Sequence, residues 1–330
     1  MKRLLKIVNK ILFVIVILLI WIMVGLFLHN KIQLAREREL LEPLGELVEV
    51  DGCNISVYTE GKGDKTLVFL QGGALPSPIL EAKSLYSLLS DKYRIVVLER
   101  PGYGFSSEES EIIPLKTIID RERTALDKLQ VKAPYILIPY SASGIEAILW
   151  TQLYPEDVEA IIGLDMSIPE YYEEMYDMAE LRLAKEENML LLDSYLFFYQ
   201  ALGLTRFQPI DEILDSFKTG NLTEEDKAVY KAIAYKRYPN KTMMTGMLSL
   251  PEDIELIKSM PKTDVPMLLF ISNGKELGMS SPEKWIQLQK GYVANNKSAT
   301  YIELDCGHSM HNIEYNRISI EIKSFIEGLD

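Results

Sequence analysis

The sequence has few of the residues that build disulfide frameworks, zinc sites and nucleic-acid surfaces. Only two of its 330 residues are cysteine, Cys53 and Cys306, so it contains no disulfide framework and no zinc-type ligand spacing. Lys and Arg number 35 against 48 Asp and Glu, which gives a net charge of −13. This excess of acid argues against nucleic acid as a partner, and against a broad basic face on anionic lipid, because both need surplus positive charge. No motif indicates a metal or a cofactor.

Charge is also missing from one long stretch near the N-terminus. Residues 11–28 contain no charged or polar side chain, and as a helix they would span about 27 Å, close to the hydrocarbon thickness of a bilayer. We therefore predict a transmembrane signal anchor within residues 1–30 and a juxtamembrane stalk at 31–45. A cleaved signal peptide is the alternative, but its apolar region is usually shorter and ends at a small-residue cleavage site that is absent here.

The charges that flank this run predict its orientation. Four basic residues lie among the first ten, whereas the basic residues that follow the run are diluted by Glu37 and Glu39. The positive-inside rule then predicts a single-pass membrane protein, with a cytoplasmic N-terminus and the remaining ~300 residues outside the cytoplasm.

Beyond residue 45 short apolar runs alternate with helical patterns. A hairpin is predicted at 47–50 and 54–60 around Asp51-Gly52, and further strands at 66–70, 94–98, 135–139, 158–164, 266–271 and 299–304. Helices are predicted at 78–89, 113–129, 144–154, 281–293 and 313–328. This alternation predicts an α/β fold, a mostly parallel twisted sheet flanked by helices. Strand-like runs disappear from about 167 to 260, so we expect one domain at 46–330 with a helical cap insertion there.

Ser141 stands just after the strand predicted at 135–139 and directly before a predicted helix. Such a sharp turn projects one side chain above the sheet edge and aims backbone N–H groups at the same point, which suits a nucleophile whose attack generates an oxyanion. The G-x-S-x-G pattern is imperfect, because Pro139 and Ser143 replace its glycines, although Gly144 follows one residue later. A helix N-cap is the ordinary alternative for a serine in this position.

The catalytic base follows from the scarcity of histidine. Of three histidines, His29 lies at the membrane end of the anchor, and His308 and His311 follow the last predicted strand. Gly307 permits a tight loop that returns an imidazole over the sheet edge, so His308 is the predicted base. His311 is expected to begin the final helix or to line the pocket.

From about residue 47 to 329 the chain resembles the α/β-hydrolase superfamily, on four motifs in the family's order. Residues 71–73 (QGG) stand where the family carries its His-Gly oxyanion motif, and residues 99–106 (ERPGYGFS) are similar to its D-x-x-G-x-G-x-S loop, with Glu for Asp. Residues 150–158 (WTQLYPEDV) resemble the segment after the nucleophile helix, and 306–308 (CGH) matches the catalytic G-H loop. The resemblance implies an oxyanion hole made by the backbone N–H groups of Gly73 and Ala142.

The resemblance leaves two candidates for the acid that orients the histidine. The family order of nucleophile, acid and histidine places the acid after the strand at 266–271, where Glu276 is the only carboxylate. Some members draw the acid from the end of the preceding strand, where this chain carries Asp165. We predict Glu276 as the acid and keep Asp165 as the alternative, with loop capping as its ordinary role.

Together these residues predict a serine hydrolase acting on a small-molecule substrate. Ser141 would attack a carbonyl, His308 would carry its proton to the leaving group, and water would then cleave the acyl-enzyme. The expected substrate is an ester, thioester or amide of a small, largely apolar acyl group. The departures from the motif leave a second class open, a hydrolase-like surface binding protein with impaired chemistry.

Overall fold

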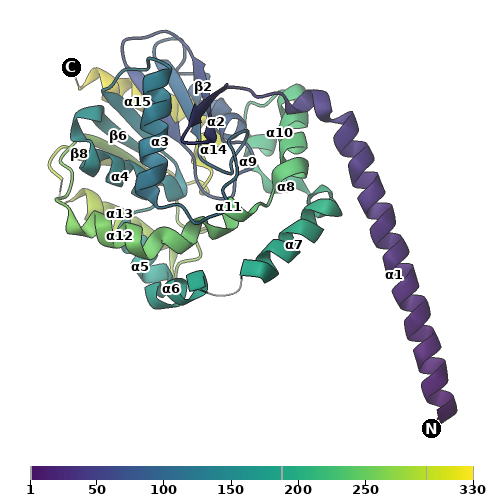
Figure 1. The fold of residues 1–330 in the computed structure, drawn as a ribbon. Helices are drawn as coiled ribbons and strands as arrows, with labels where there is room; N and C mark the ends of the chain where they lie inside the picture. The colour runs from purple at the N-terminus through teal and green to yellow at the C-terminus, as the bar shows by residue number, and fades with distance from the viewer. Residues whose placement is uncertain (1, 187–188, 295, 330) are drawn as a thin grey trace.

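An eight-stranded sheet lies at the centre of the domain (Figure 1). The computed structural model describes residues 2–186, 189–294 and 296–329. The strands are β1 (Glu46–Val50), β2 (Cys53–Glu60), β3 (Thr66–Leu70), β4 (Arg94–Glu99), β5 (Tyr135–Pro139), β6 (Val158–Leu164), β7 (Met267–Ile271) and β8 (Ala299–Glu303). Their order in the sheet is β1-β2-β4-β3-β5-β6-β7-β8. β2 is antiparallel to β1 and β4, and every other neighbouring pair is parallel.

The hairpin at the start of the sheet has the turn that its sequence predicts. Val50 pairs with Cys53 across the turn, and the two residues between them, Asp51 and Gly52, have φ values of 52° and 79°. Positive φ at both central positions is the geometry that Asp-Gly favours in a two-residue hairpin.

Helices cover both faces of the sheet, as the buried strands require. In β3 every residue is buried, with Val68 and Leu70 in one core and Leu67 and Phe69 in the other. The first core includes side chains of α3 (Leu115–Lys128), α4 (Gly144–Leu153), α12 (Leu250–Ser259) and α13 (Pro282–Val293). The second includes side chains of α2 (Pro78–Tyr86), α14 (Met310–Ile313) and α15 (Tyr315–Glu327). Burial on both faces explains why these strands are short, continuous apolar runs.

The segment between β6 and β7 is helical wherever it has regular structure among the described residues. Its helices are α5 (Pro169–Met175), α6 (Met178–Glu186), α7 (Met189–Ala201), α8 (Ile210–Ile213), α9 (Asp215–Lys218), α10 (Glu224–Arg237), α11 (Lys241–Thr245) and α12, with short 3₁₀ turns at Leu204–Phe207 and Gly246–Ser249. We call this segment the cap. It occupies the positions at which the sequence predicts an insertion.

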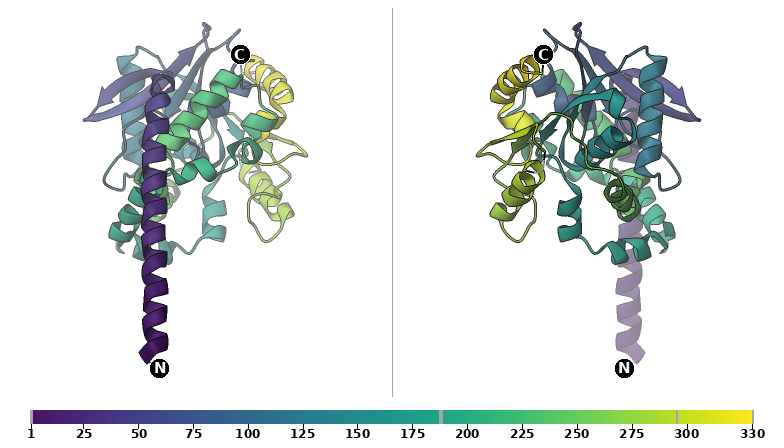
Figure 2. Two further views of the ribbon diagram at one scale, coloured as in Figure 1. Left: turned by 90° about the vertical axis from the view of Figure 1, so that its right-hand side faces the viewer. Right: turned by 90° about the vertical axis from the view of Figure 1, so that its left-hand side faces the viewer.

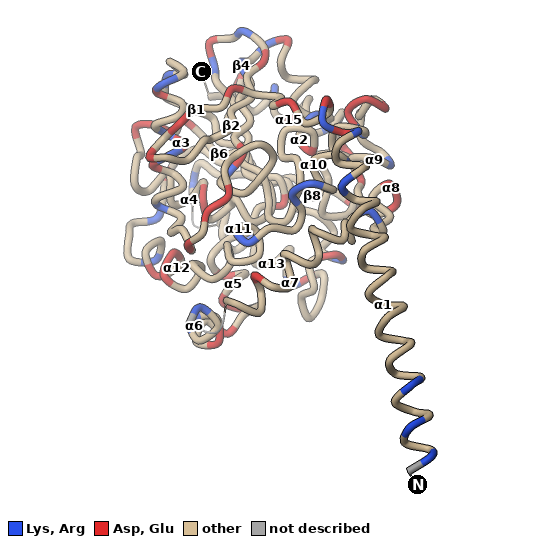
Figure 3. The backbone as a smooth tube through the Cα atoms, turned by 45° about the vertical axis from the view of Figure 1, so that its right-hand side comes forward, with Lys and Arg blue, Asp and Glu red and all other residues tan. Residues whose placement is uncertain are grey.

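The N-terminal helix α1 (Lys2–Arg36) is a single helix that stands away from the body of the domain (Figure 1), and its N-terminal end extends past the domain (Figure 2). It is long and apolar enough to cross a membrane. Its most apolar 18-residue stretch has a mean hydropathy of 3.3, and none of this stretch is buried against the rest of the protein. Figure 3 shows its basic residues near the N-terminus and a charge-free middle. The first six residues of the stalk predicted at 31–45 continue α1, and a 3₁₀ turn follows at Arg38–Leu41.

Candidate active site

Ser141 lies in the sharp turn that connects β5 to α4. A 3₁₀ turn, Ser141–Ser143, leads directly into the helix. Ser141 has a φ of 54°, a left-handed conformation that is strained for a residue other than glycine and is found where the surrounding structure enforces it. The N–H of Ser167, just beyond β6, donates to the Ser141 carbonyl at 2.7 Å. The strained turn thus holds the serine at the C-terminal edge of the parallel strands.

Ser143 and Gly144 stand at and just after the position of the second glycine of the motif. The buried Ser143 hydroxyl donates to the carbonyl of Leu70 at 2.6 Å and accepts from the N–H of Tyr140 at 2.9 Å. A Cβ on Gly144 would lie 2.1 Å from the carbonyl oxygen of Ser167. The close approach that requires glycine is therefore one position later than in the motif.

His308 connects Ser141 to Asp165. Its Nε2 lies 2.8 Å from Ser141 Oγ, and its Nδ1 lies 2.6 Å from Asp165 Oδ2. Asp165 follows β6 and is completely buried. Its other oxygen, Oδ1, accepts from the N–H of Ser272 and from Trp285 Nε1, both at 2.8 Å. The carboxylate can then accept from Nδ1–H, which leaves Nε2 unprotonated and able to take the serine proton.

Glu276 does not contact the imidazole, which corrects the preference for it over Asp165. It is exposed, and its Oε2 accepts from the backbone N–H of His308 at 2.8 Å. Gly307 makes room for this contact, because a Cβ there would lie 2.6 Å from the same oxygen. Glu276 therefore holds the backbone of the histidine loop, while the alternative acid, Asp165, contacts the ring.

The loop after β3 packs directly against the turn that carries Ser141. A Cβ on Gly72 would lie 2.9 Å from that of Ser141, and one on Gly73 would lie 3.8 Å from that of Ala142. Arg100 holds the loop, because its Nη2 donates to the carbonyl of Gln71 at 2.8 Å. The structure thus brings Gly73 and Ala142 together beside the serine, where an oxyanion hole requires its backbone donors.

Comparisons with known proteins identify the family. A family model for the alpha/beta hydrolase fold matches residues 65–314, more than half of the chain. The chain belongs to the alpha/beta hydrolase family. The predictions of this fold and of a hydrolase are confirmed.

Individual relatives agree with this assignment. The hydrolase is 32% identical over 321 residues to the uncharacterized protein YbdG of Bacillus subtilis, covering 96% of each chain. It is similar in fold to an epoxide hydrolase, VrEH1, from Vigna radiata (TM-score 0.64, 18% identity, 86% of this chain and 97% of that one). It is also similar to a thermophilic esterase from Thermogutta terrifontis (TM-score 0.54, 16% identity, 86% and 97%). At these identities the structural likenesses show the fold alone.

His311 lies in α14 and is completely buried. Its ring centroid is 4.2 Å from that of Tyr140, and neither ring nitrogen has a hydrogen-bond partner among the described residues. Burial, together with the neighbouring His308, lowers the pKa of His311 to about 3. It is therefore a neutral ring packed behind the site in the hydrolase, and it lines neither of the cavities described below.

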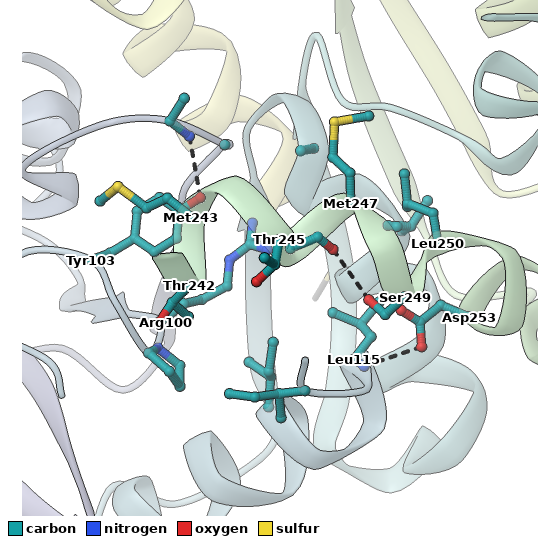
Figure 4. Close-up of a pocket in the computed structure, with 18 of the residues that line it drawn as sticks. Arg100, Tyr103, Leu115, Thr242, Met243, Thr245, Met247, Ser249, Leu250 and Asp253 are labelled. Carbon is teal, nitrogen blue, oxygen red and sulfur yellow. Dashed lines mark hydrogen bonds between the residues drawn. The ribbon is translucent and has the colours of Figure 1, made fainter. Parts of the chain in front are cut away.

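Two cavities lie between the sheet edge and the cap of the hydrolase. The first, of about 170 Å³, is lined by Gly73 and Ala142 from the core and by apolar cap residues that include Met247 and Leu250 (Figure 4). The second, of about 350 Å³, is lined by cap residues and by Ala74 and Pro76, of which Ala74 lines both cavities. Within the described residues no group of His, Cys, Asp or Glu is arranged to hold a metal ion.

Some groups at the site carry no sequence motif. Trp285 and Ser272, which fix the orientation of Asp165, come from segments more than 100 residues further along the chain. Arg100 belongs to the ERPGYGFS loop, but its contact with Gln71 depends on how β3 and β4 pair. Asp165, which Trp285 and Ser272 orient, did have a recognisable signal, because it is a carboxylate directly after a buried strand.

Proposed function

We propose that this hydrolase is a serine hydrolase that forms an acyl-enzyme on Ser141, with His308 as base and Asp165 as the orienting acid. The observation that carries the proposal is the chain of contacts from Ser141 Oγ through the imidazole to Asp165, at 2.8 and 2.6 Å. Both distances lie within hydrogen-bond reach, and the acid is fixed on its far side by two further donors.

The reaction proceeds in two acyl transfers. Ser141 Oγ attacks the carbonyl carbon as its proton moves to His308 Nε2, and the N–H groups of Gly73 and Ala142 stabilise the oxyanion, each by about 3 kcal/mol. The imidazolium then protonates the leaving group, and the ester bond to Ser141 remains. Water, activated by the same imidazole, cleaves that bond and regenerates the free serine.

The cavities support a substrate with an apolar acyl group joined as an ester, thioester or amide. The first cavity places apolar cap residues beside Gly73 and Ala142, where the acyl carbonyl would lie. A hydroxyl nucleophile at this turn favours acyl transfer, and the esterase from Thermogutta terrifontis provides a precedent within the same fold.

Labelling by a fluorophosphonate tests the nucleophile. Wild-type protein should be labelled stoichiometrically, Ser141→Ala should not be labelled, and Ser280→Ala, which changes an exposed serine, should behave as wild type. Failure to label the correctly folded wild type would refute the enzyme and favour the binding-protein alternative.

We further propose that α1 anchors the hydrolase as a single-pass protein with a cytoplasmic N-terminus. The charge-free middle of the helix and the basic residues before it support this orientation. A cysteine at exposed Ile320 should react with a membrane-impermeant maleimide in intact cells. Reaction only after permeabilisation would contradict the orientation.

A further inference from the structure

Helix α7 of the cap presents an apolar face to solvent. Its inner stripe faces the protein through the buried Leu196, whereas its outer side chains are each more than half exposed: Leu190, Leu191, Tyr195, Phe197 and Phe198. Outside α1, ten of the thirteen exposed large apolar residues in the described part of the chain belong to the cap. Contiguous apolar patches of this kind mark surfaces that contact a partner or a membrane.

The C-terminal end of α7 is hydrogen-bonded to α1 just after the apolar run of residues 11–28. The buried Asn30 donates to the carbonyls of Gln200 and Ala201 at 2.9 and 3.3 Å. Arg206 contacts Asn30 Oδ1 through Nε at 2.9 Å and forms a two-bond ion pair with Glu37 at 2.7 Å. Because the apolar run ends at Leu28, Asn30 lies only about 3 Å further along the helix axis.

These contacts determine where α7 lies relative to a bilayer that contains α1. Figure 1 shows α7 leading away from the contact on the side toward which α1 descends. The helix is about 20 Å long, and its one charged residue, Asp193, pairs with Lys241 at 3.1 Å. An aromatic-rich apolar face at this level has the composition of a helix in the membrane interface.

The second cavity connects this helix to the catalytic edge. Its lining includes Tyr195 and Tyr199 of α7 and also Ala74, the residue after Gly73. Its volume of about 350 Å³ is suited to an extended apolar chain. A lipid tail that enters beside α7 would bring its acyl carbonyl toward the candidate oxyanion hole.

We infer that the apolar face of α7 lies in the surface of the bilayer that holds α1, and that the substrate is a long-chain acyl ester drawn from that bilayer through the second cavity. This inference rests on the serine hydrolase and the membrane anchor proposed above. The occupant is the bilayer rather than a second copy of the chain, because the contact with Asn30 places α7 at the level where the apolar run of α1 ends.

The position of α7 is tested with the full-length protein in phosphatidylcholine vesicles. An environment-sensitive fluorophore is attached through Phe197→Cys and, as a matched control, through Ile320→Cys, since both native side chains are 67% exposed. The native thiols do not compete, because burial raises the pKa of Cys53 to about 11 and that of Cys306 to about 12. The fluorophore at 197 should emit at shorter wavelength and be quenched by lipids spin-labelled on the acyl chain, and the one at 320 should not.

Two results would overturn the membrane contact. One is emission typical of water at both sites. The other is a blue shift at 197 that grows with protein density and resists the spin-labelled lipid, which would identify a second copy as the occupant.

Turnover of two esters tests the entry path. Phe197→Asp should lower hydrolysis of a long-chain p-nitrophenyl ester embedded in vesicles by about tenfold and leave that of soluble p-nitrophenyl acetate unchanged, because a charge opposes insertion of α7. Ile320→Asp should leave both rates unchanged. Equal losses on the two esters in Phe197→Asp would overturn the entry path. Absence of acetate hydrolysis in the wild type would instead refute the proposed chemistry. The fluorescence experiment would still decide whether α7 contacts the membrane, because it does not depend on turnover.

Discussion

Asp165→Asn should lower the turnover number of the hydrolase by about 10³- to 10⁴-fold while leaving the protein folded. Asparagine has almost the shape of aspartate and tolerates left-handed backbone better than most residues, as position 165 requires with its φ of 46°. Its amide oxygen can keep the two hydrogen bonds from Ser272 and Trp285. Stability should therefore fall by only about 1–2 kcal/mol.

The loss of rate follows from the tautomer of the histidine. Ser272 and Trp285 both donate, so the amide oxygen must face them and the amide NH₂ must face His308. Nδ1 then becomes the acceptor and Nε2 carries the proton, so Nε2 can no longer accept the proton of Ser141. The loss corresponds to about 4–5.5 kcal/mol in the activation barrier, at about 1.4 kcal/mol for each factor of ten.

Ester turnover by the purified variants decides this prediction, with Glu276→Gln as the matched control. A glutamine oxygen at 276 can still accept from the His308 N–H, so this variant should stay within about twofold of wild type, the loss of one exposed charge being small. A folded Asp165→Asn variant that keeps more than a tenth of the wild-type kcat would refute the role of Asp165. An equal loss in Glu276→Gln would refute it as well.

Three further changes test other parts of the structure. Gly144→Ala drives a methyl group into the carbonyl of Ser167, so it should cost about 1–3 kcal/mol of stability and lower kcat. An unchanged melting temperature together with full kcat would contradict this prediction. Burial raises the pKa of Glu81 from 4.5 to about 7, so the free energy of unfolding should fall by roughly 3 kcal/mol as pH rises through that interval. Denaturant titrations of Glu81→Gln at several pH values should not show this fall in the free energy of unfolding. If wild type and variant lose stability in parallel as pH rises, Glu81 is not the group responsible. Arg206→Ala should loosen the contact between α1 and the cap, because Asn30 would keep only its bonds to the carbonyls of Gln200 and Ala201. The distance distribution between spin labels on α1 and on the cap should then broaden. A distribution as narrow as that of wild type would show that the ion pair with Glu37 is dispensable.

The sheet could be predicted from the sequence almost residue by residue. Strands buried on both faces are continuous apolar runs, and β3, β5 and β6 have the predicted bounds. The apolar run does not show how far the first helix extends, because α1 continues beyond it to Arg36. Asn30 and the residues after it remain helical, and contacts with Arg206, which is distant in sequence, hold them against the cap.

The acid could not be chosen from local sequence because both candidates follow buried strands that end at the same sheet edge. They differ in what surrounds them after folding. Asp165 is buried and fixed by donors from two distant segments, whereas Glu276 is exposed and satisfied by a backbone N–H. Such differences arise only from tertiary packing, so a sequence rule based on the usual order of the three residues selects the carboxylate that does not contact the imidazole.

The departures from the motif around Ser141 bear on the alternative that the protein binds a ligand without catalysis. A lost glycine suggests lost function only if the contact that required glycine is also lost. Here Ser143 fills its position by hydrogen-bonding Tyr140 and Leu70, and Gly144 provides the close approach to Ser167. Since these contacts are made, Ser143 at the second glycine position is no longer an argument for impaired chemistry. That alternative must instead be argued from the reactivity of Ser141.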